Sequence, residues 1–317
     1  MVHQITLAWP GWRVERLIGK GSFGQVYELN RDILGSVERS ALKVVSLPAS
    51  PDEIQKLYRQ GHSPQQVADY YSRCREGIIR EYSLMAEIKG HPNIVYCDDF
   101  RQIRHADGIG WDIHIKMELL TGLFQVMPLY YSEPLVVQLG KSILSALALC
   151  EKRGILHRDI KPENIFYANT GEFKLGDFGV ATVIQQSGRL TTIGTYDYMA
   201  PEVYHNLPYG PSADLYSLGL VMYWAMNGRR GPFLPEDAAI PTAEQREAAW
   251  KRRMEGQPIP LPAYGSPELQ QIVMAAISHD PKLRFTSAAH MRKELERLKV
   301  APFLPAPESH FRPAPDL

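Results

Sequence analysis

The spacing of apolar residues separates a strand-rich first part of the chain from a helical second part. Residues 12–29 alternate apolar and polar side chains around a glycine-rich turn, and residues 37–47 repeat the alternation. A period of two is typical of strands, so a β-hairpin and a third strand are predicted here. Strand character returns over residues 92–119. We therefore expect a small antiparallel sheet.

One main helix is expected within this sheet region. Ser63 and Pro64 suit an N-cap and a first helical turn, and apolar residues then recur at helical spacing until Gly90. Residues 48–73 are predicted to form a short helix and an N-terminal extension of this main helix. Such an extension could be a docking surface or a dimer contact, or an elaboration without function.

The second part of the chain is predicted to be mainly helical. Two short strands flank a tight turn at residues 169–171. The expected helices cover residues 133–154, 214–227, 242–254, 266–278 and 286–299. The fold class is therefore α+β and bilobal, with a sheet lobe over residues 1–120, a larger helical lobe over 121–300 and a proline-rich tail over 301–317. The tail could lead to another domain, and the enlarged region 229–262 could form a partner surface or only a loop.

Composition limits the classes of function. The chain has 317 residues, 44% of them hydrophobic and 22% charged, which suits a globular protein with two domains or lobes. Its formal net charge of zero does not favour nucleic acid as a partner. The three cysteines show neither a disulfide framework nor zinc spacing, so a reducing compartment, the cytoplasm, is expected. Neither a secretory signal nor a membrane span is predicted.

The glycines Gly19, Gly21 and Gly24 come at the tip of the first hairpin. Glycine lets backbone amides approach phosphate oxygens, although this pattern alone is also typical of a flexible turn. A dinucleotide site needs a helix after the glycines. Here Val26 and Tyr27 continue as a strand, so we expect a phosphate-covering hairpin instead.

Lys43 lies in the apolar strand that follows. A lysine there needs an anion, which a nucleotide phosphate would supply, although an edge-strand lysine could also reach water. Glu81 on the predicted main helix is the expected orienting carboxylate. Glu76 and Glu87 are rivals for that role.

The segment HRDIKPENIFYANTGEFKLGDFG at residues 157–179 carries the main chemical signal. Asp159 can accept the proton of a hydroxyl, and Lys161 can neutralise charge on a transferred phosphate. Asn164 and Asp177 offer hard oxygen ligands for Mg²⁺. Phosphoryl transfer depends mainly on positioning and electrostatics, so this set predicts transfer of phosphate from ATP.

The chain resembles the eukaryotic-type (Hanks-type) protein kinase family over roughly residues 12–300. The matching motifs are the glycine loop, Lys43, HRDIKPEN at 157–164, DFG at 177–179, APE at 200–202, DLYSLG at 214–219 and Arg284 in DPKLRFTS. Lys161, together with Gly194-Thr195, is similar to the Ser/Thr branch. The resemblance implies a protein-kinase-like fold and an ATP-dependent Ser/Thr protein kinase acting on protein substrates.

The resemblance also implies roles for individual residues. ATP with Mg²⁺, or alternatively Mn²⁺, would be the cofactor, Lys43 would pair with Glu81, and Thr195 would contact Asp159 and Lys161. The implied nucleotide-binding residues are Ile18, Gly19, Gly21, Gly24, Val26, Ala41, Lys43, the gatekeeper Met117, the hinge residues Glu118 and Leu120, and Phe166. The implied structural contacts are from Asp214 to the catalytic-loop backbone and from Glu202 to Arg284.

Arg158 implies control by phosphorylation. In similar kinases this arginine meets a phosphate on the activation segment, here residues 180–195. Thr191 is the expected phosphosite and Thr192 its neighbour, with self-association allowing autophosphorylation in trans. Both threonines could instead be ordinary polar loop residues.

Two other classes of function remain as alternatives. A pseudokinase usually lacks the lysine, the catalytic aspartate or the metal-binding aspartate, and all three are present here. Small-molecule kinases of the same fold generally lack the APE motif and the late arginine.

Overall fold

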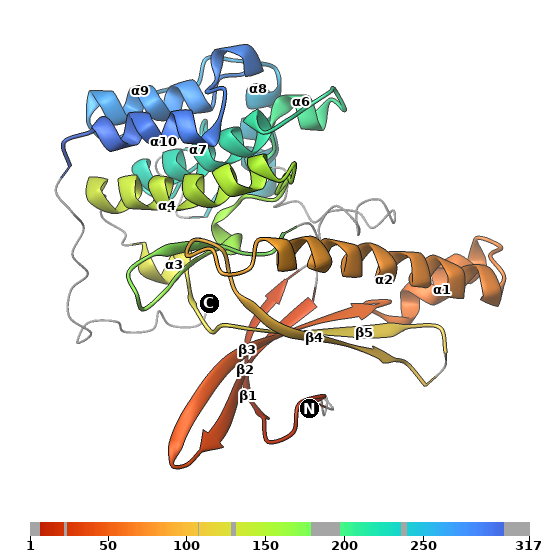
Figure 1. The fold of residues 1–317 in the computed structure, drawn as a ribbon. Helices are drawn as coiled ribbons and strands as arrows, with labels where there is room; N and C mark the ends of the chain where they lie inside the picture. The colour runs from red at the N-terminus through yellow and green to blue at the C-terminus, as the bar shows by residue number, and fades with distance from the viewer. Residues whose placement is uncertain are drawn as a thin grey trace. The chain divides into compact units, whose positions relative to one another are not determined.

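The computed structural model describes residues 7–21, 24–106, 108–127, 131–178, 197–235 and 240–300. They form two compact units (Figure 1). The first comprises the described residues of Met1–Gly90 and Val95–Leu120, with Phe178. The second comprises His91–Ile94 and the described residues of Thr121–Asp177 and Thr192–Leu317.

The first unit is built on a five-stranded antiparallel sheet of order β1-β2-β3-β5-β4. Its strands are β1 (Arg13–Gly21), β2 (Gly24–Ile33), β3 (Ser36–Leu47), β4 (Cys97–Arg104) and β5 (Trp111–Met117). The antiparallel sheet predicted from the period of two is confirmed. The strand expected from residue 92 begins only at Cys97, because Ile94 bridges to Leu175 and the Asn93 carbonyl accepts the Leu175 amide at 2.9 Å.

The two faces of this sheet are covered by different parts of the chain. Helix α2 (Pro64–Glu87) packs on one face, where Val45 and Ile115 are buried with Tyr71 and Ile78. The other face is covered by residues before β1: Trp9 and Trp12 are buried there with Tyr27, Leu29 and Leu42. Burying large side chains on both faces stabilises the sheet by about 1.5–3 kcal/mol for each fully buried side chain.

The insertion forms two helices, α1 (Pro51–Arg59) and the first turns of α2. The Ser63 Oγ accepts the Gln66 amide at 3.3 Å, and the Gln66 side chain accepts the Ser63 amide at 2.8 Å. This reciprocal pair of hydrogen bonds is a capping box and explains why α2 begins at Pro64. The predicted short helix and helix extension are confirmed.

The second unit is mainly helical (Figure 1). Its helices are α3 (Leu123–Val126), α4 (Glu133–Lys152), α6 (Pro201–Tyr204), α7 (Ser212–Met226), α8 (Ala243–Met254), α9 (Pro267–Ala276) and α10 (Ala288–Arg297). A small sheet contains β6 (Thr121–Gly122), β7 (Ile165–Tyr167) and β8 (Phe173–Leu175). Helix α7 is buried on all sides except at Ser212 and Ser217, as expected for the central helix of a core.

Among the described helices, α4 has the length and apolar composition needed to cross a membrane. However, 56% of its most apolar window is buried inside the structure. The helix packs against α7, α10 and β8. Packing in the core therefore accounts for its hydrophobicity.

Candidate active site

Asp214, near the start of α7, holds the backbone of the catalytic loop. Its Oδ2 accepts the His157 amide at 2.8 Å and its Oδ1 accepts the Arg158 amide at 2.9 Å. Complete burial raises the pKa of Asp214, although these two hydrogen bonds oppose the shift. Arg158 itself has a φ of 66°, a strained value for a residue with a side chain. The predicted contact from Asp214 to the loop backbone is confirmed.

The carboxylate of Asp159 lies between two donors from its own loop. Lys161 Nζ is 3.0 Å from Oδ1 and 2.9 Å from Oδ2, and Asn164 Nδ2 is 2.9 Å from Oδ2. Asp159 is 6% exposed and Asn164 only 4%. Hydrogen bonds to an ionised group are short and strong, so the carboxylate is held in one orientation by donors of its own loop.

Asn164 and Asp177 fit the donor chemistry of a magnesium site. The Asn164 amide nitrogen donates to the Asp159 carbonyl at 2.7 Å as well as to its carboxylate, which leaves Oδ1 as the atom that can face a cation. The Gly176 amide donates to the Asn164 carbonyl at 2.8 Å, which ties Asp177 closely to Asn164 along the backbone. Asp177 has a φ of 56°, a second strained position in this site.

The described residues contain no cluster of three or more His, Cys, Asp or Glu side chains suited to a metal. A dedicated protein cage for a metal ion is therefore absent from that part of the chain. Mg²⁺ usually takes one or two protein carboxylates and completes its shell with water and substrate phosphates. The two oxygen donors Asn164 and Asp177 fit such an ion.

Several of the nucleotide-binding residues predicted in the first unit lie in register across its sheet. Strand register places Gly19, Val26, Lys43 and Ile115 side by side across β1, β2, β3 and β5. The next row pairs Ala41 with Met117. Lys43 is 4% exposed on an interior strand, so the alternative of an edge-strand lysine reaching water is wrong.

In the hairpin of β1 and β2, position 24 has room for glycine but not for a side chain. Its φ is 139°, and a Cβ built there would lie 2.1 Å from the Val44 carbonyl oxygen. No L-residue with a side chain fits without moving β3. A Cβ on Gly19 would make an ordinary contact with Val26 at 3.7 Å, and Gly21 pairs with Gly24 at the hairpin end.

The predicted hinge follows β5. The Glu118 amide donates to the Tyr96 carbonyl at 3.1 Å, and the Glu118 carboxylate accepts the Tyr96 amide at 2.6 Å. These bonds hold the chain that leads through Leu120 to β6. Among the other predicted adenine contacts, Ile18 is exposed in β1, and Phe166 is half-buried in β7, in the second unit.

Some predicted residues cannot be placed. Thr191, Thr192 and Thr195 lie outside the described residues, and so does the side chain of Glu81, whose backbone belongs to α2. The pairing of Lys43 with Glu81 and the contacts of Thr195 therefore stay predictions.

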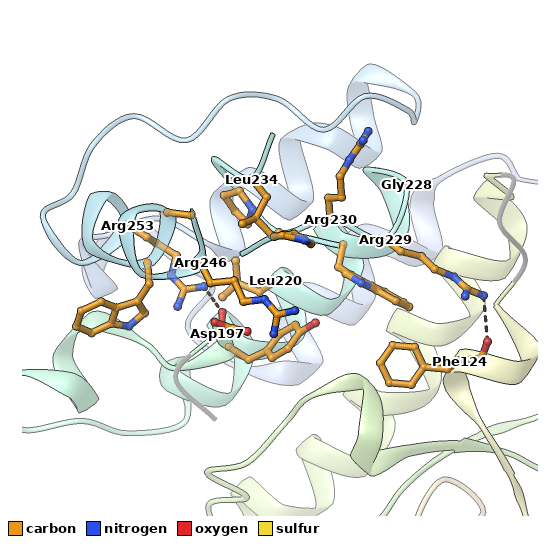
Figure 2. Close-up of a pocket in the computed structure, with 16 residues that line it drawn as sticks. Phe124, Asp197, Leu220, Gly228, Arg229, Arg230, Leu234, Arg246 and Arg253 are labelled. Atoms are coloured by element: carbon orange, nitrogen blue, oxygen red, sulfur yellow. Dashed lines mark hydrogen bonds between the residues drawn. The ribbon is translucent and has the colours of Figure 1, made fainter. Parts of the chain in front are cut away.

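The sequence did not reveal a cavity of about 620 Å³ in the second unit (Figure 2). Four arginines contribute to its lining: Arg229, Arg230, Arg246 and Arg253. One signal was present, because Arg246, Ala249, Trp250 and Arg253 recur at the spacing of one helix face. An amphipathic helix normally buries apolar residues on such a face, so two arginines there are unusual.

Comparison with known proteins defines the class. The model of the protein kinase domain matches residues 12–295, so the chain belongs to the protein kinase family. It is 29% identical to CBL-interacting serine/threonine-protein kinase 5 of Arabidopsis thaliana and to the serine/threonine-protein kinase PknA of Mycobacterium tuberculosis, over 92% and 87% of its length. It is 33% identical to sperm motility kinase 3A of Mus musculus over 68% of its length.

The chain spans only part of these relatives: 59% of the Arabidopsis protein, 58% of the mycobacterial one and 40% of the mouse one. Membership of the protein kinase family, with Ser/Thr kinases among its relatives, is thus established for the domain. The bilobal kinase fold predicted from the motifs is confirmed by the family match and by the sheet and helical units.

Proposed function

We propose that the chain is an active Ser/Thr protein kinase that transfers the γ-phosphoryl group of ATP to protein hydroxyls. The observation that carries this proposal is the placement of the Asp159 carboxylate between Lys161 and Asn164, at 2.9–3.0 Å from their nitrogen atoms. A pseudokinase has no need to hold this carboxylate in a single orientation. The APE segment, anchored to Arg284 through Glu202, favours a protein acceptor over a small molecule.

In this mechanism Asp159 accepts the proton of the substrate hydroxyl as that oxygen attacks phosphorus. Lys161 donates to the Asp159 carboxylate and would also neutralise negative charge on the transferred phosphoryl group. Bound ATP with its Mg²⁺ supplies the phosphoryl group and screens its charge. Asn164 Oδ1 and the Asp177 carboxylate would hold the ion, and Lys43 would contact the phosphates. Asp214 contributes by fixing the loop that carries Asp159.

The proposal includes control through Arg158. Its side chain is exposed, and its guanidinium lies 5.8 Å from the centre of the Tyr209 ring. An exposed guanidinium suits a phosphate on Thr191, or on Thr192, transferred from a second copy of the kinase. Mass spectrometry of active protein should find this phosphate, and Thr191→Val should lower activity. Full activity with both threonines unmodified would rule out this form of control.

The test of the catalytic proposal is transfer of radiolabelled phosphate to the kinase itself, to a generic basic protein and to small hydroxyl compounds. Asp159→Asn should lower transfer by about 10²–10⁴-fold, the range expected for loss of a general base. Lys43→Met should lower it by about 10²–10³-fold, the range expected for loss of an electrostatic contact to the reacting group. Lys251→Met, which removes an exposed lysine on α8, is the matched control. Wild-type turnover by Asp159→Asn would overturn the mechanism, and transfer only to small compounds would favour a small-molecule kinase.

The proposed compartment is the cytoplasm. Cys74, Cys97 and Cys150 form no disulfide in the described part of the chain, and Cys74 and Cys150 are buried. Free thiols persist in reducing compartments. Fluorescence microscopy of the tagged chain in its own cell type would test this location.

A further inference from the structure

The arginine-lined cavity lies within the second unit, on the central helix α7. Leu220 and Trp224 of α7 form part of its wall, and residues 228–234 continue the wall after that helix ends. One face of α8, the turn at Asp197 and Tyr198, Phe124 of α3 and Pro241 complete it (Figure 2). This turn lies just before the APE motif at 200–202.

The described lining of the cavity has an excess of positive charge. Arg229 and Arg230 come from the segment after α7, and Arg246 and Arg253 lie seven residues apart on α8. Asp197 is the one acidic side chain among the described lining residues. Burial raises the pKa of Asp197, although the charges of Arg253 and Arg246 oppose this. A partly enclosed surface of one sign concentrates ions of the opposite sign.

Arg246 is available for such an ion. Its side chain points toward Asp197, as does that of Arg253 (Figure 2). Arg253 donates to the Asp197 carbonyl. Within the described part of the chain, Arg246 makes neither a hydrogen bond nor an ion pair, although its positive charge favours the ionised form of Asp197. A half-buried guanidinium loses hydration and gains stability when an anion pairs with it.

Arg229, on the other side of the cavity, likewise forms no ion pair with a described carboxylate. Its Nη2 donates to the carbonyls of Phe124, at 3.0 Å, and Met127. Its Nε is buried with no acceptor among the described residues. Burial lowers the pKa of Arg229, the direction expected when no carboxylate compensates for lost water. Its φ of 61° is also strained.

The cavity is electrostatically linked to the catalytic loop. Burial raises the pKa of Glu163, and the charges of Asp159 and Asp197 raise it further. Glu163 therefore interacts with both the catalytic carboxylate and the acidic residue of the cavity. The Tyr198 carbonyl accepts the Ser217 hydroxyl at 2.7 Å, which fixes the turn at Asp197 and Tyr198 to α7. An anion bound here would lie beside the turn at Asp197, whose charge also acts on Glu163 of the catalytic loop.

We propose that this cavity is a subsite for an anionic side chain of the protein substrate, a carboxylate or a phosphate, so that the kinase selects acidic substrates. The inference rests on the proposed kinase function and specifies its substrate class. Guanidinium groups suit both anions because their planar donors match carboxylate and phosphate oxygens.

Peptide binding tests the subsite without turnover. Fluorescence anisotropy would use the Asp159→Asn form and peptides that share one threonine acceptor, flanked by glutamates, by glutamines or by one phosphoserine. At least one anionic peptide should bind about fivefold more tightly than the glutamine peptide, the effect of about 1 kcal/mol. Adding Arg246→Gln should remove most of this preference. Lys251→Gln, which removes a lysine whose side chain is 71% exposed on the same helix, should preserve it.

A charge-reversal variant distinguishes loss of the subsite from loss of folding. Arg246→Glu should reverse the preference, so that a lysine-flanked peptide binds more tightly than the glutamate peptide. Equal affinities for the glutamate, glutamine and phosphoserine peptides would overturn the subsite, and so would equal losses in Arg246→Gln and Lys251→Gln. Comparison of the glutamate and phosphoserine peptides shows whether the subsite prefers a carboxylate or a phosphate. If the wild type bound anionic peptides selectively yet transferred no phosphate to any acceptor, the kinase proposal would fail while the subsite stood.

Discussion

Arg284 and Glu202 form a bidentate ion pair, with Arg284 Nη1 2.7 Å from Glu202 Oε1 and Nη2 2.8 Å from Oε2. Their side chains are 0% and 6% exposed. The guanidinium also donates to the carbonyls of Ser278, Ser212 and His279 at 2.8–3.2 Å. All its donors are therefore used, and the pair joins α6 to the start of α7 and to the segment before α10. The predicted pairing is confirmed.

Replacing Arg284 by Met should destabilise the kinase by about 3–5 kcal/mol, because Glu202 would be left buried without a counter-charge. Urea unfolding of the single variant measures this loss. Adding Glu202→Leu should recover much of it, since the unpaired charge is then removed as well. A single variant as stable as the wild type would contradict this account of the pair.

Asp214→Asn should slow catalysis without removing a group that touches substrate. The amide keeps one acceptor but places an NH₂ against the amide of His157 or Arg158, so the loop carrying Asp159 loses part of its support. We expect kcat to fall by at least about tenfold, because small displacements of catalytic groups are costly. The KM for ATP should change much less. Steady-state kinetics on the folded variant decide this, and an unchanged kcat would show that the loop holds its position without Asp214.

Gly24→Ala should destabilise the first unit, whereas Gly19→Ala should not. The added methyl would lie 2.1 Å from the Val44 carbonyl oxygen at position 24, but 3.7 Å from Val26 at position 19. The expected losses are about 1–3 kcal/mol for Gly24→Ala and less than about 1 kcal/mol for Gly19→Ala. Thermal unfolding compares the two proteins directly. Equal stabilities would mean that β3 shifts at little cost.

The stability of the kinase should decrease in mildly acidic solution because of His91. Burial first, and then the charge of Arg292 on α10, lower the pKa of His91, while Glu172 opposes them. Its imidazole already accepts the Asn93 amide at 3.2 Å. The unfolded chain therefore takes up this proton more readily. The free energy of unfolding falls as pH drops through the ordinary histidine pKa, about 6.5, toward the lower folded value.

Urea unfolding between about pH 5 and 8, where histidine titrates, measures this dependence. His91→Gln keeps an acceptor for Asn93 and should flatten the curve. Some slope should remain, because burial also lowers the pKa of His114. His62→Gln, at an exposed position, is the control and should leave the curve unchanged. Identical curves for the wild type and His91→Gln would show that His91 is not the cause.

The sequence by itself determined the elements and the core of the site, because these depend on nearby residues. Strand alternation, the Ser63 cap and the compact segment from Asp159 to Asn164 all act over a few positions along the chain. The donors that surround the Asp159 carboxylate come from that one loop. Its local geometry therefore followed from the motif.

Only the tertiary structure decided where distant segments meet. It placed Trp9 and Trp12 on the face of the sheet opposite α2. It moved Asn93 from the expected strand to a contact with β8, and it brought Arg229 and Arg246 to one cavity. The sequence could not predict these contacts because each depends on the packing of elements that lie far apart along the chain. The same packing brings several arginines to one cavity, which is the basis for the proposal that the kinase selects acidic substrates.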